Sequence, residues 1–350
     1  MTEPTYIPLR LHTEFSITDG MVRIKKLIAK AQEYGLPALG ISDLMNEFGL
    51  VKFYKACRGA GIKPIGAADV WIGNPNAPDK PFRAMLIIRN DAGYLRLSEL
   101  LTEAYVGKDR NVHHAELNPE WLENGNNSGL ICLSGAHYGE VGVNLLNGNE
   151  DAARAAALKY AAWFPDAFYL ELQRLPERPE WEACVSGSVK LAEELGLPVV
   201  ATHPTQFMSS DDFNAHEARV CIAGGWVLTD KKRPRDFTPS QFFIPPETMA
   251  ERFSDLPEAL ENTVEIAKRC NLHITLGKNF LPLFPTPDGL SLDDYLVKLS
   301  NEGLQERMVQ LYPDEAERAA KMPEYQERLD FELNIIIQMK FPGYFLIVQD

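Results

Sequence analysis

Apolar positions along the first 200 residues switch repeatedly between two spacings. Stretches with helical spacing, such as Ile24, Leu27, Ile28 and Ala31, alternate with short continuous apolar runs, such as residues 84–88. Runs of this kind are typical of strands buried on both faces of a parallel sheet. The pattern predicts strands at residues 7–12, 37–42, 65–72, 84–88, 129–134, 168–172 and 197–202, and helices at residues 22–34, 47–59, 92–105, 151–163 and 181–195.

Strands separated by helices form βαβ units, so we expect an α/β fold with a mainly parallel sheet. The sequence carries about seven such units and neither of the glycine-rich phosphate-binding loops G-x-G-x-x-G and G-x-x-x-x-G-K-[ST]. This combination favours a closed or nearly closed barrel. A doubly wound open sheet remains the alternative, because periodicity alone does not distinguish the two.

The pattern changes after about residue 204, where helical spacing dominates. Helices are predicted at residues 212–222, 247–253, 256–269, 292–311 and 324–339, with proline-rich connectors at 233–235 and 280–288. We therefore expect a barrel domain with a helical extension over residues 1–275 and a second, mainly helical region over residues 276–350. Residues 341–350 begin a new apolar segment with nothing to pack on, so we expect the chain to be a fragment of a longer protein.

The net charge of −14 argues against a chain that grips a phosphate backbone by itself. The chain does contain one short basic run, formed by Lys231, Lys232, Arg233 and Arg235. We interpret that run as a solvated loop, because charge runs usually face water. DNA binding by this chain alone is therefore expected to be weak or absent.

Cysteine usage indicates a reducing compartment. The five cysteines are scattered and never form a C-x-x-C pair, so we expect reduced, buried thiols and no zinc ribbon. No apolar signal segment follows Met1, and no apolar run approaches the length of a membrane span. We expect a cytoplasmic protein without a membrane partner.

In an α/β barrel the functional groups lie at the carboxyl ends of the strands. Candidate metal ligands at these ends are His12, Asp19, Asp43, Asp69, Glu171 and His203. They are interleaved with Arg10 and Arg83, whose guanidinium groups repel a cation. The residues allow a hydrolytic metal site or a polar pocket in which they hydrogen-bond to one another; we favour the pocket, because a multinuclear site needs more imidazole and carboxylate. No G-x-S-x-G or H-E-x-x-H motif is present.

Several segments, taken together, resemble a known family. Residues 10–20, 35–43, 49–54, 61–65, 197–202, 232–235, 259–270 and 341–348 resemble, in the same order, blocks of bacterial DNA polymerase III alpha subunits, which are C-family replicative polymerases. The first blocks are similar to the N-terminal PHP (polymerase and histidinol phosphatase) domain, and the last is similar to the entry to the palm. The resemblance implies a distorted (β/α)₇ barrel followed by a mainly helical start of the palm and thumb region.

The resemblance also marks the positions where metal-competent members hold zinc or manganese. His12 and Asp19 are kept and Asp69 stands for Glu, whereas Arg10, Leu44, Arg83 and Gln206 replace His, Ala136 replaces Cys and Pro204 replaces Asp. We therefore expect a degenerate site without metal or catalytic residues, with Asp43, Glu171 and His203 as a supporting polar pocket. Arg10 and Arg83 are expected to neutralise Asp19, Asp69 and Asp43. His137 and His203 lie close to the family positions but off register, which leaves a relocated site open.

The family further implies partners. We expect docking of the separate proofreading exonuclease subunit (epsilon), contact with the rest of the alpha subunit, and Mg²⁺ only in the palm, outside this chain. The alternatives are an active PHP metallophosphoesterase or 3'–5' exonuclease and, less in keeping with the C-terminal segment, a free-standing barrel enzyme.

Overall fold

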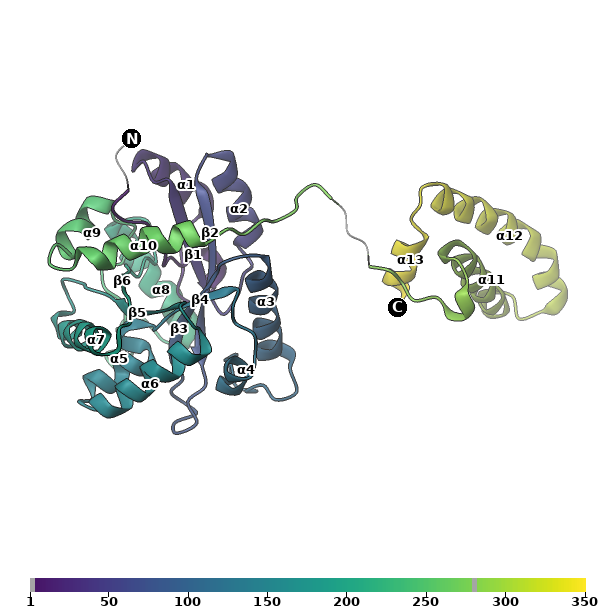
Figure 1. Cartoon of the computed structure of the whole chain (residues 1–350). Coiled ribbons are helices and arrows are strands. Elements are labelled where there is room, and N and C mark those ends of the chain that lie inside the picture. The colour runs from purple at the N-terminus through teal and green to yellow at the C-terminus, as the bar shows by residue number, and fades with distance from the viewer. Residues whose placement is uncertain (1–3, 279–281) are drawn as a thin grey trace. The chain divides into compact units, whose positions relative to one another are not determined.

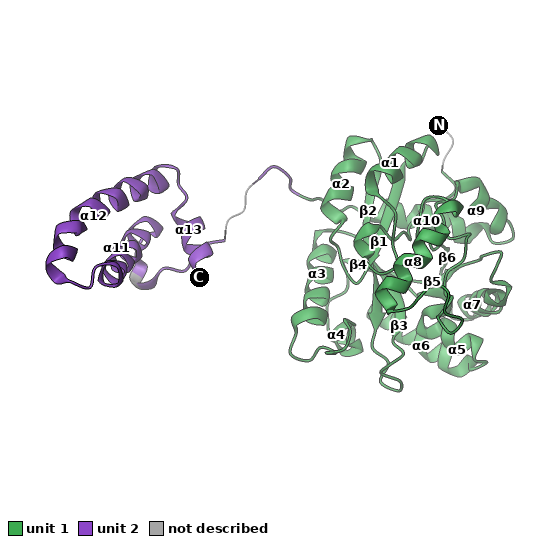
Figure 2. Cartoon of the chain, turned by 180° about the vertical axis from the view of Figure 1, so that it is seen from behind, with its two compact units in different colours: residues 1–274 green, residues 275–350 purple. Residues whose placement is uncertain are grey.

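The computed structural model describes residues 4–278 and 282–350. The chain divides into two compact units, residues 1–274 and residues 275–350 (Figure 2). The proline-rich connector predicted at residues 280–288 lies partly outside the described residues.

A six-stranded sheet whose strands follow one another in chain order forms the centre of the first unit (Figure 1). Its strands are β1 (Ala38–Leu44), β2 (Lys63–Ile72), β3 (Phe82–Ile88), β4 (Leu130–Leu133), β5 (Phe168–Leu172) and β6 (Val199–Ala201). Strand β3 pairs antiparallel with both neighbours, and the other pairs are parallel. The α/β class and the predominance of parallel pairs agree with the sequence pattern. The regular alternation of strand and helix fails at β2–β3, because only the short segment 73–81 joins them.

The sheet curls until its two ends meet across residues 8–12. Ser42 of β1 donates its backbone N–H to the carbonyl of Leu11 (2.8 Å), and His12 donates to the carbonyl of Thr205 (2.9 Å). The sequence predicted a strand at residues 7–12, but this segment does not form a regular strand. It makes an isolated parallel bridge from Leu11 to Thr205. These bonds nearly close the barrel and bring the first segment beside the residues that follow β6.

Close backbone approach and apolar burial hold this closure in place. A Cβ added to Gly40 of β1 would stand 2.5 Å from the carbonyl oxygen of Leu9, so only glycine fits there. Residues 84–88 of β3 are completely buried, as their continuous apolar run predicted. Helix α7 ends where predicted, because Gly196 adopts a left-handed conformation with φ 65°.

Helices surround the sheet (Figure 1). They are α1 (Ile24–Glu33), α2 (Leu50–Gly59), α3 (Asp91–Val106), α4 (Pro119–Glu123), α5 (Glu140–Leu146), α6 (Glu150–Trp163), α7 (Glu182–Leu195), α8 (Phe213–Gly224), α9 (Pro246–Arg252) and α10 (Pro257–Arg269). The sequence pattern missed α4 and α5, which are too short to show a helical period. The basic run after α8 is not wholly solvated: Arg233 is buried and pairs with Glu217 at 2.5 Å, whereas Lys231, Lys232 and Arg235 are exposed.

The second unit consists of α11 (Leu292–Leu311), α12 (Glu315–Gln338) and α13 (Pro342–Gln349) around the buried Leu296, Leu333 and Leu346. Helix α12 starts earlier than predicted, because Asp314 caps it and Pro323 lies inside it. A proline usually interrupts a helical pattern, so the sequence placed the start after it. Within the described ranges no single helix is long and apolar enough to cross a membrane. Helices α12 and α13 reach that length and apolar composition only when taken together, and the pair is bent by 113°.

Candidate functional site

The carboxyl ends of the parallel strands surround a cavity of about 240 Å³. Seven of the positions singled out in the sequence line it: Arg10, Asp19, Leu44, Asp69, Arg83, Pro204 and Gln206. Arg83 lies at this edge although it begins its strand, because β3 runs antiparallel and pairs Arg83 with Trp71 of β2. The expected gathering of groups at one end of the barrel is therefore present in the structure.

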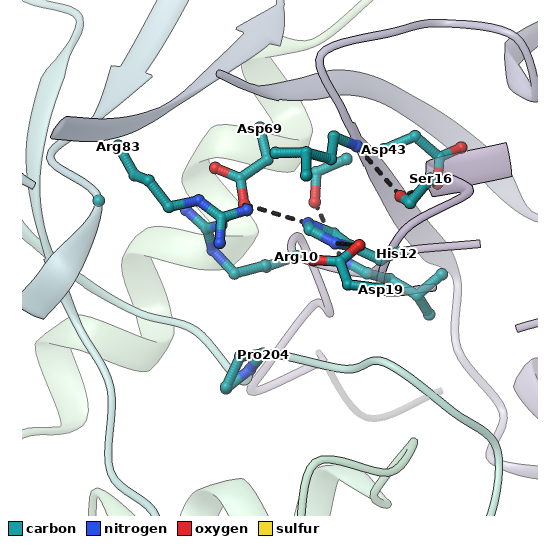
Figure 3. A network of polar contacts seen from close by, with 12 residues as sticks. Arg10, His12, Ser16, Asp19, Asp43, Asp69, Arg83 and Pro204 are labelled. Atoms are coloured by element: carbon teal, nitrogen blue, oxygen red, sulfur yellow. Dashed lines mark hydrogen bonds and ion pairs between the residues drawn. The ribbon is translucent and has the colours of Figure 1, made fainter. Parts of the chain in front are cut away.

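Arg10 is the centre of a buried ion-pair network (Figure 3). Its guanidinium makes two hydrogen bonds to Glu171, from Nε (2.7 Å) and Nη2 (2.9 Å), and its Nη1 donates to Asp69 Oδ2. The side chain is 7% exposed, and those of Glu171 and Asp69 are fully buried. A buried guanidinium with two carboxylate partners is neutralised, and it occupies space at the strand ends.

Arg83 adds a second cation to the same carboxylate, donating from Nη2 to Asp69 Oδ2 at 2.5 Å. Its guanidinium also lies over the Trp71 ring, 4.7 Å from the centroid. Burial by itself would raise the pKa of Asp69, but the charges of Arg10 and Arg83 outweigh it and hold that pKa well below its ordinary value. Asp69 therefore remains ionised.

His12 bridges two carboxylates, with Nδ1 2.9 Å from Asp19 Oδ1 and Nε2 3.0 Å from Asp69 Oδ2. Burial opposes the charged ring, but the charge of Asp19 and hydrogen bonds to both carboxylates raise the pKa of His12 to about 9. Asp19 thus pairs with His12 and does not contact either arginine directly. The expectation that arginines neutralise all three aspartates holds by direct contact only for Asp69.

Asp43 is held by hydroxyl and backbone groups. It accepts from the backbone N–H of Thr13 (2.6 Å), from Thr13 Oγ1 (2.8 Å) and from Ser16 Oγ (2.8 Å). Despite these bonds, burial raises the pKa of Asp43 above its ordinary value. None of these partners of Asp43 is an arginine, so the prediction that a guanidinium neutralises Asp43 is wrong.

The remaining predicted positions supply few donors. Leu44 and Pro204 are apolar, and Ala136 lies in the short 3₁₀ turn Ala136–Tyr138 after Gly135. Among the described contacts, the Gln206 carboxamide makes no hydrogen bond through its buried Oε1. Leu44, Pro204 and Gln206 line the cavity and leave its charge to the ion-pair network.

The two off-register histidines point to other partners. His137 stacks on Trp181 with ring centroids 3.5 Å apart, and His203 places Nε2 2.9 Å from the carbonyl oxygen of Phe242. Burial, reinforced by nearby arginines, lowers the pKa of each to about 3. Across residues 4–278 and 282–350, no three His, Cys, Asp or Glu side chains gather as a metal-binding group. Guanidinium groups hold Asp69 Oδ2 and both carboxylate oxygens of Glu171, so these three oxygens are already paired.

Sequence reasoning missed most of the cavity's uncharged walls. Trp71, Tyr138, Trp181 and Phe237 supply aromatic rings, and Gln173 and Gln241 supply carboxamides. It also missed the Thr202 hydroxyl, which donates to Glu171 at 2.5 Å. Except for Trp71, which lies in β2, these residues lie outside the strands, in loops and short 3₁₀ turns, where side-chain positions follow no periodic pattern.

His216 of α8 places Nε2 2.5 Å from the backbone oxygen of Asp19. Arg219, on the same helix, donates to the carbonyls of Ile17 and Glu14. Helix α8 therefore fixes the turn that carries Asp19 at the cavity rim.

Comparison with known proteins shows the family of the chain. The family model described as "PHP domain" matches residues 8–175, and the model described as "Bacterial DNA polymerase III alpha NTPase domain" matches residues 294–350. Over all 350 residues the chain is 98% identical to DNA polymerase III subunit alpha of Neisseria meningitidis serogroup A. The chain belongs to the DNA polymerase III alpha subunit family.

More distant members of the family match along the same length. The chain is 48% identical to the Pseudomonas fluorescens protein over 99% of this chain. It is 47% identical to the Escherichia coli K12 protein over all 350 residues of this chain. The chain spans 31% of the meningococcal relative, 29% of the Pseudomonas protein and 30% of the Escherichia coli protein.

Solved structures also match. One described as a metal-dependent phosphoesterase from Bifidobacterium adolescentis aligns with a TM-score of 0.32 and 11% identity, covering 71% of this chain and 95% of that one.

Proposed function

We propose that this chain is the catalytically silent PHP and early palm portion of a template-directed DNA polymerase, and that it serves as a docking platform for the separate proofreading exonuclease subunit. One observation carries the first half of the proposal. The Arg10 guanidinium binds Glu171 through two bonds and Asp69 through a third, at the position where the family resemblance puts a metal-ligating histidine. A cation there would meet a fixed positive charge and carboxylates that are already paired.

The expected consequence is a loss of hydrolytic chemistry. A metal-activated hydroxide needs a cation with an open coordination position, and no side chain of the cavity replaces that function. The purified chain should therefore hydrolyse a phosphodiester such as the p-nitrophenyl ester of thymidine 5'-monophosphate no faster than buffer, with Zn²⁺, Mn²⁺ or Mg²⁺ present. Chelator-sensitive turnover would overturn this proposal.

The alternative, an active PHP metallophosphoesterase, draws support from one feature: Asp69 Oδ1 is buried without a hydrogen-bond partner. Asp69 Oδ1 is a meagre donor set, because the His12 ring already lies between two carboxylates. The assay above separates the two functions, and a His12→Ala variant is its control, since turnover from the site must disappear when that ring is removed.

Polymerase activity is proposed for the longer protein only. Nucleotidyl transfer by two Mg²⁺ ions needs clustered carboxylates, which the family places beyond residue 350. We expect no cofactor in this chain and no primer extension by it, and extension of a primed template by the purified 350-residue chain would contradict that. The net charge of −14 supports weak DNA binding by this portion alone.

Exonuclease docking is supported by exposed apolar surface on the first unit. Phe48 is 64% and Val106 70% exposed beside one groove, and Ile222 is 83% and Val227 67% exposed at the end of α8. Exposed apolar patches of this kind mark interaction sites.

The docking proposal is tested by gel filtration with the exonuclease subunit. We expect co-elution, and loss of it in only one of two paired variants, Phe48→Asp with Val106→Asp or Ile222→Asp with Val227→Asp. Each pair is the matched control for the other, because both add two charges to exposed positions. Separate elution of the unaltered proteins would contradict docking.

A further inference from the structure

The cavity at the strand ends contains polar atoms that the ion-pair network leaves without partners. Asp69 Oδ1, Gln206 Oε1 and Arg83 Nε are all buried and make no hydrogen bond within the chain. Asp69 is 0% and Gln206 4% exposed. Buried polar groups are nearly always hydrogen-bonded, so an acceptor, a carboxamide and an N–H donor around one cavity indicate an occupant that offers both donors and acceptors.

Aromatic rings form much of the rest of the wall. Trp71, Tyr138, Trp181 and Phe237 line the same cavity, which is about 240 Å³ in volume. Rings of this kind favour a flat ligand, because planar π-systems stack on aromatic and guanidinium faces. The volume corresponds to about eight waters at about 30 Å³ each, which leaves room for one small ring system and a few waters.

The charge balance excludes an anionic ligand. The two guanidiniums at the cavity, on Arg10 and Arg83, are already paired with carboxylates. Asp19 and Asp236 also line the cavity, so a phosphate would find no free positive charge and two further carboxylates. The occupant therefore carries no negative charge, and the aromatic walls and unpartnered polar atoms favour one that is planar and polar at its edge.

We propose that this cavity binds a nucleobase, presented as a free base or an unphosphorylated nucleoside. Nucleobases carry neighbouring donors and acceptors along one edge, and a glutamine carboxamide can bond to two of them at once. Gln206 supplies that carboxamide, and Arg83 Nε and Asp69 Oδ1 are an unpartnered donor and acceptor on residues that line the same cavity. The argument uses only the cavity and does not depend on polymerase function or exonuclease docking.

The test is a titration of the full 350-residue chain with adenosine, guanosine, cytidine and thymidine. Binding is monitored by tryptophan fluorescence, because Trp71 and Trp181 line the cavity, and by ligand-observed NMR. At least one nucleoside should bind saturably at millimolar concentrations, and its 5'-monophosphate should bind at least tenfold more weakly. Ribose 5-phosphate, which lacks a base, should not bind.

Gln206→Leu should weaken nucleoside binding at least tenfold, and Gln32→Leu, which removes an exposed carboxamide from α1, should leave it unchanged. Should Gln206→Leu fail to fold, Gln206→Asn, which withdraws the amide by one methylene, must show the same loss. No saturable binding, equal binding by the Gln206 variants, or tighter binding of the monophosphate would each overturn the proposal, and the first would mean that water alone fills the cavity.

Discussion

Asp69 and Asp43 lie at the same end of the barrel on neighbouring strands, yet the chain satisfies them in opposite ways. Asp69 meets two guanidiniums and an imidazole, and its pKa falls. Asp43 meets hydroxyl and backbone donors, and burial raises its pKa. The difference shows that permanent cations keep one carboxylate charged where neutral donors only moderate the cost of burying the other.

The largest change in stability is expected when the Arg10 guanidinium, which pairs with Asp69, is removed. Arg10→Met should cost about 3–5 kcal/mol of unfolding free energy, because it leaves two buried carboxylates with too few partners. Urea unfolding at pH 7 measures the loss. Adding Glu171→Gln to Arg10→Met should recover part of it, since one orphaned charge is removed; a single variant as stable as the parent chain would contradict the network's role.

A third carboxyl extends the comparison to a group with almost no donors. Glu47, at the start of the groove beside α3, has one hydroxyl partner, Ser98 Oγ at 3.1 Å, and burial raises its pKa from 4.5 to about 7. The folded state thus binds this proton more tightly than the unfolded chain, so stability is lost as pH rises from about 4.5 through about 7.

Glu47→Gln should remove that loss. The gain in unfolding free energy of the variant over the parent should be larger at pH 8 than at pH 5 by about 1–2 kcal/mol. This figure is reduced for the partial exposure of the side chain. Thermal unfolding at the two pH values provides the comparison. A pH-independent difference would show that Glu47 titrates normally.

On the Asp43 side a single hydroxyl should matter less. Ser16→Ala removes one donor to Asp43 and an acceptor for the backbone N–H of Leu44, and should cost about 1–2 kcal/mol. Chemical denaturation resolves a change of this size. A loss as large as that of Arg10→Met would remove the distinction between the two sides.

The smallest effect is expected at an exposed ion pair. Lys30 and Glu33 of α1 are in contact at 2.6 Å but both face solvent, so Lys30→Ala should leave stability nearly unchanged. The same denaturation series measures it. A larger loss would mean that ion-pair distance, and not burial, decides the ranking of these variants.

The barrel could be predicted because its short continuous apolar runs alternate regularly with stretches of helical spacing. Residues 84–88 and 168–172 gave strands that the structure confirms, and the helix at residues 292–311 was placed with its bounds. The first segment was not a regular strand, because residues 8–12 close the ring through a few bonds and one isolated bridge. That closure is a long-range event that no local pattern records.

The candidate site was predictable in its charged residues and not in their pairing. Strand ends brought Arg10, Asp69, Arg83 and Glu171 together, as expected from a barrel. Which cation meets which carboxylate depends on side-chain reach: His12 takes Asp19, and hydroxyls take Asp43. Apart from Trp71 of β2, the aromatic and amide walls come from residues outside the strands, between 138 and 241, where spacing carries no information about contact.

The central claim is that arginine-centred ion pairs stand where related sites hold metal. Its most direct test is elemental analysis of the purified chain after incubation with Zn²⁺ and Mn²⁺ and removal of free ions. The account predicts only trace metal, equal in the parent chain and in the His12→Ala variant. Near-stoichiometric metal in the parent chain that His12→Ala abolishes would contradict it.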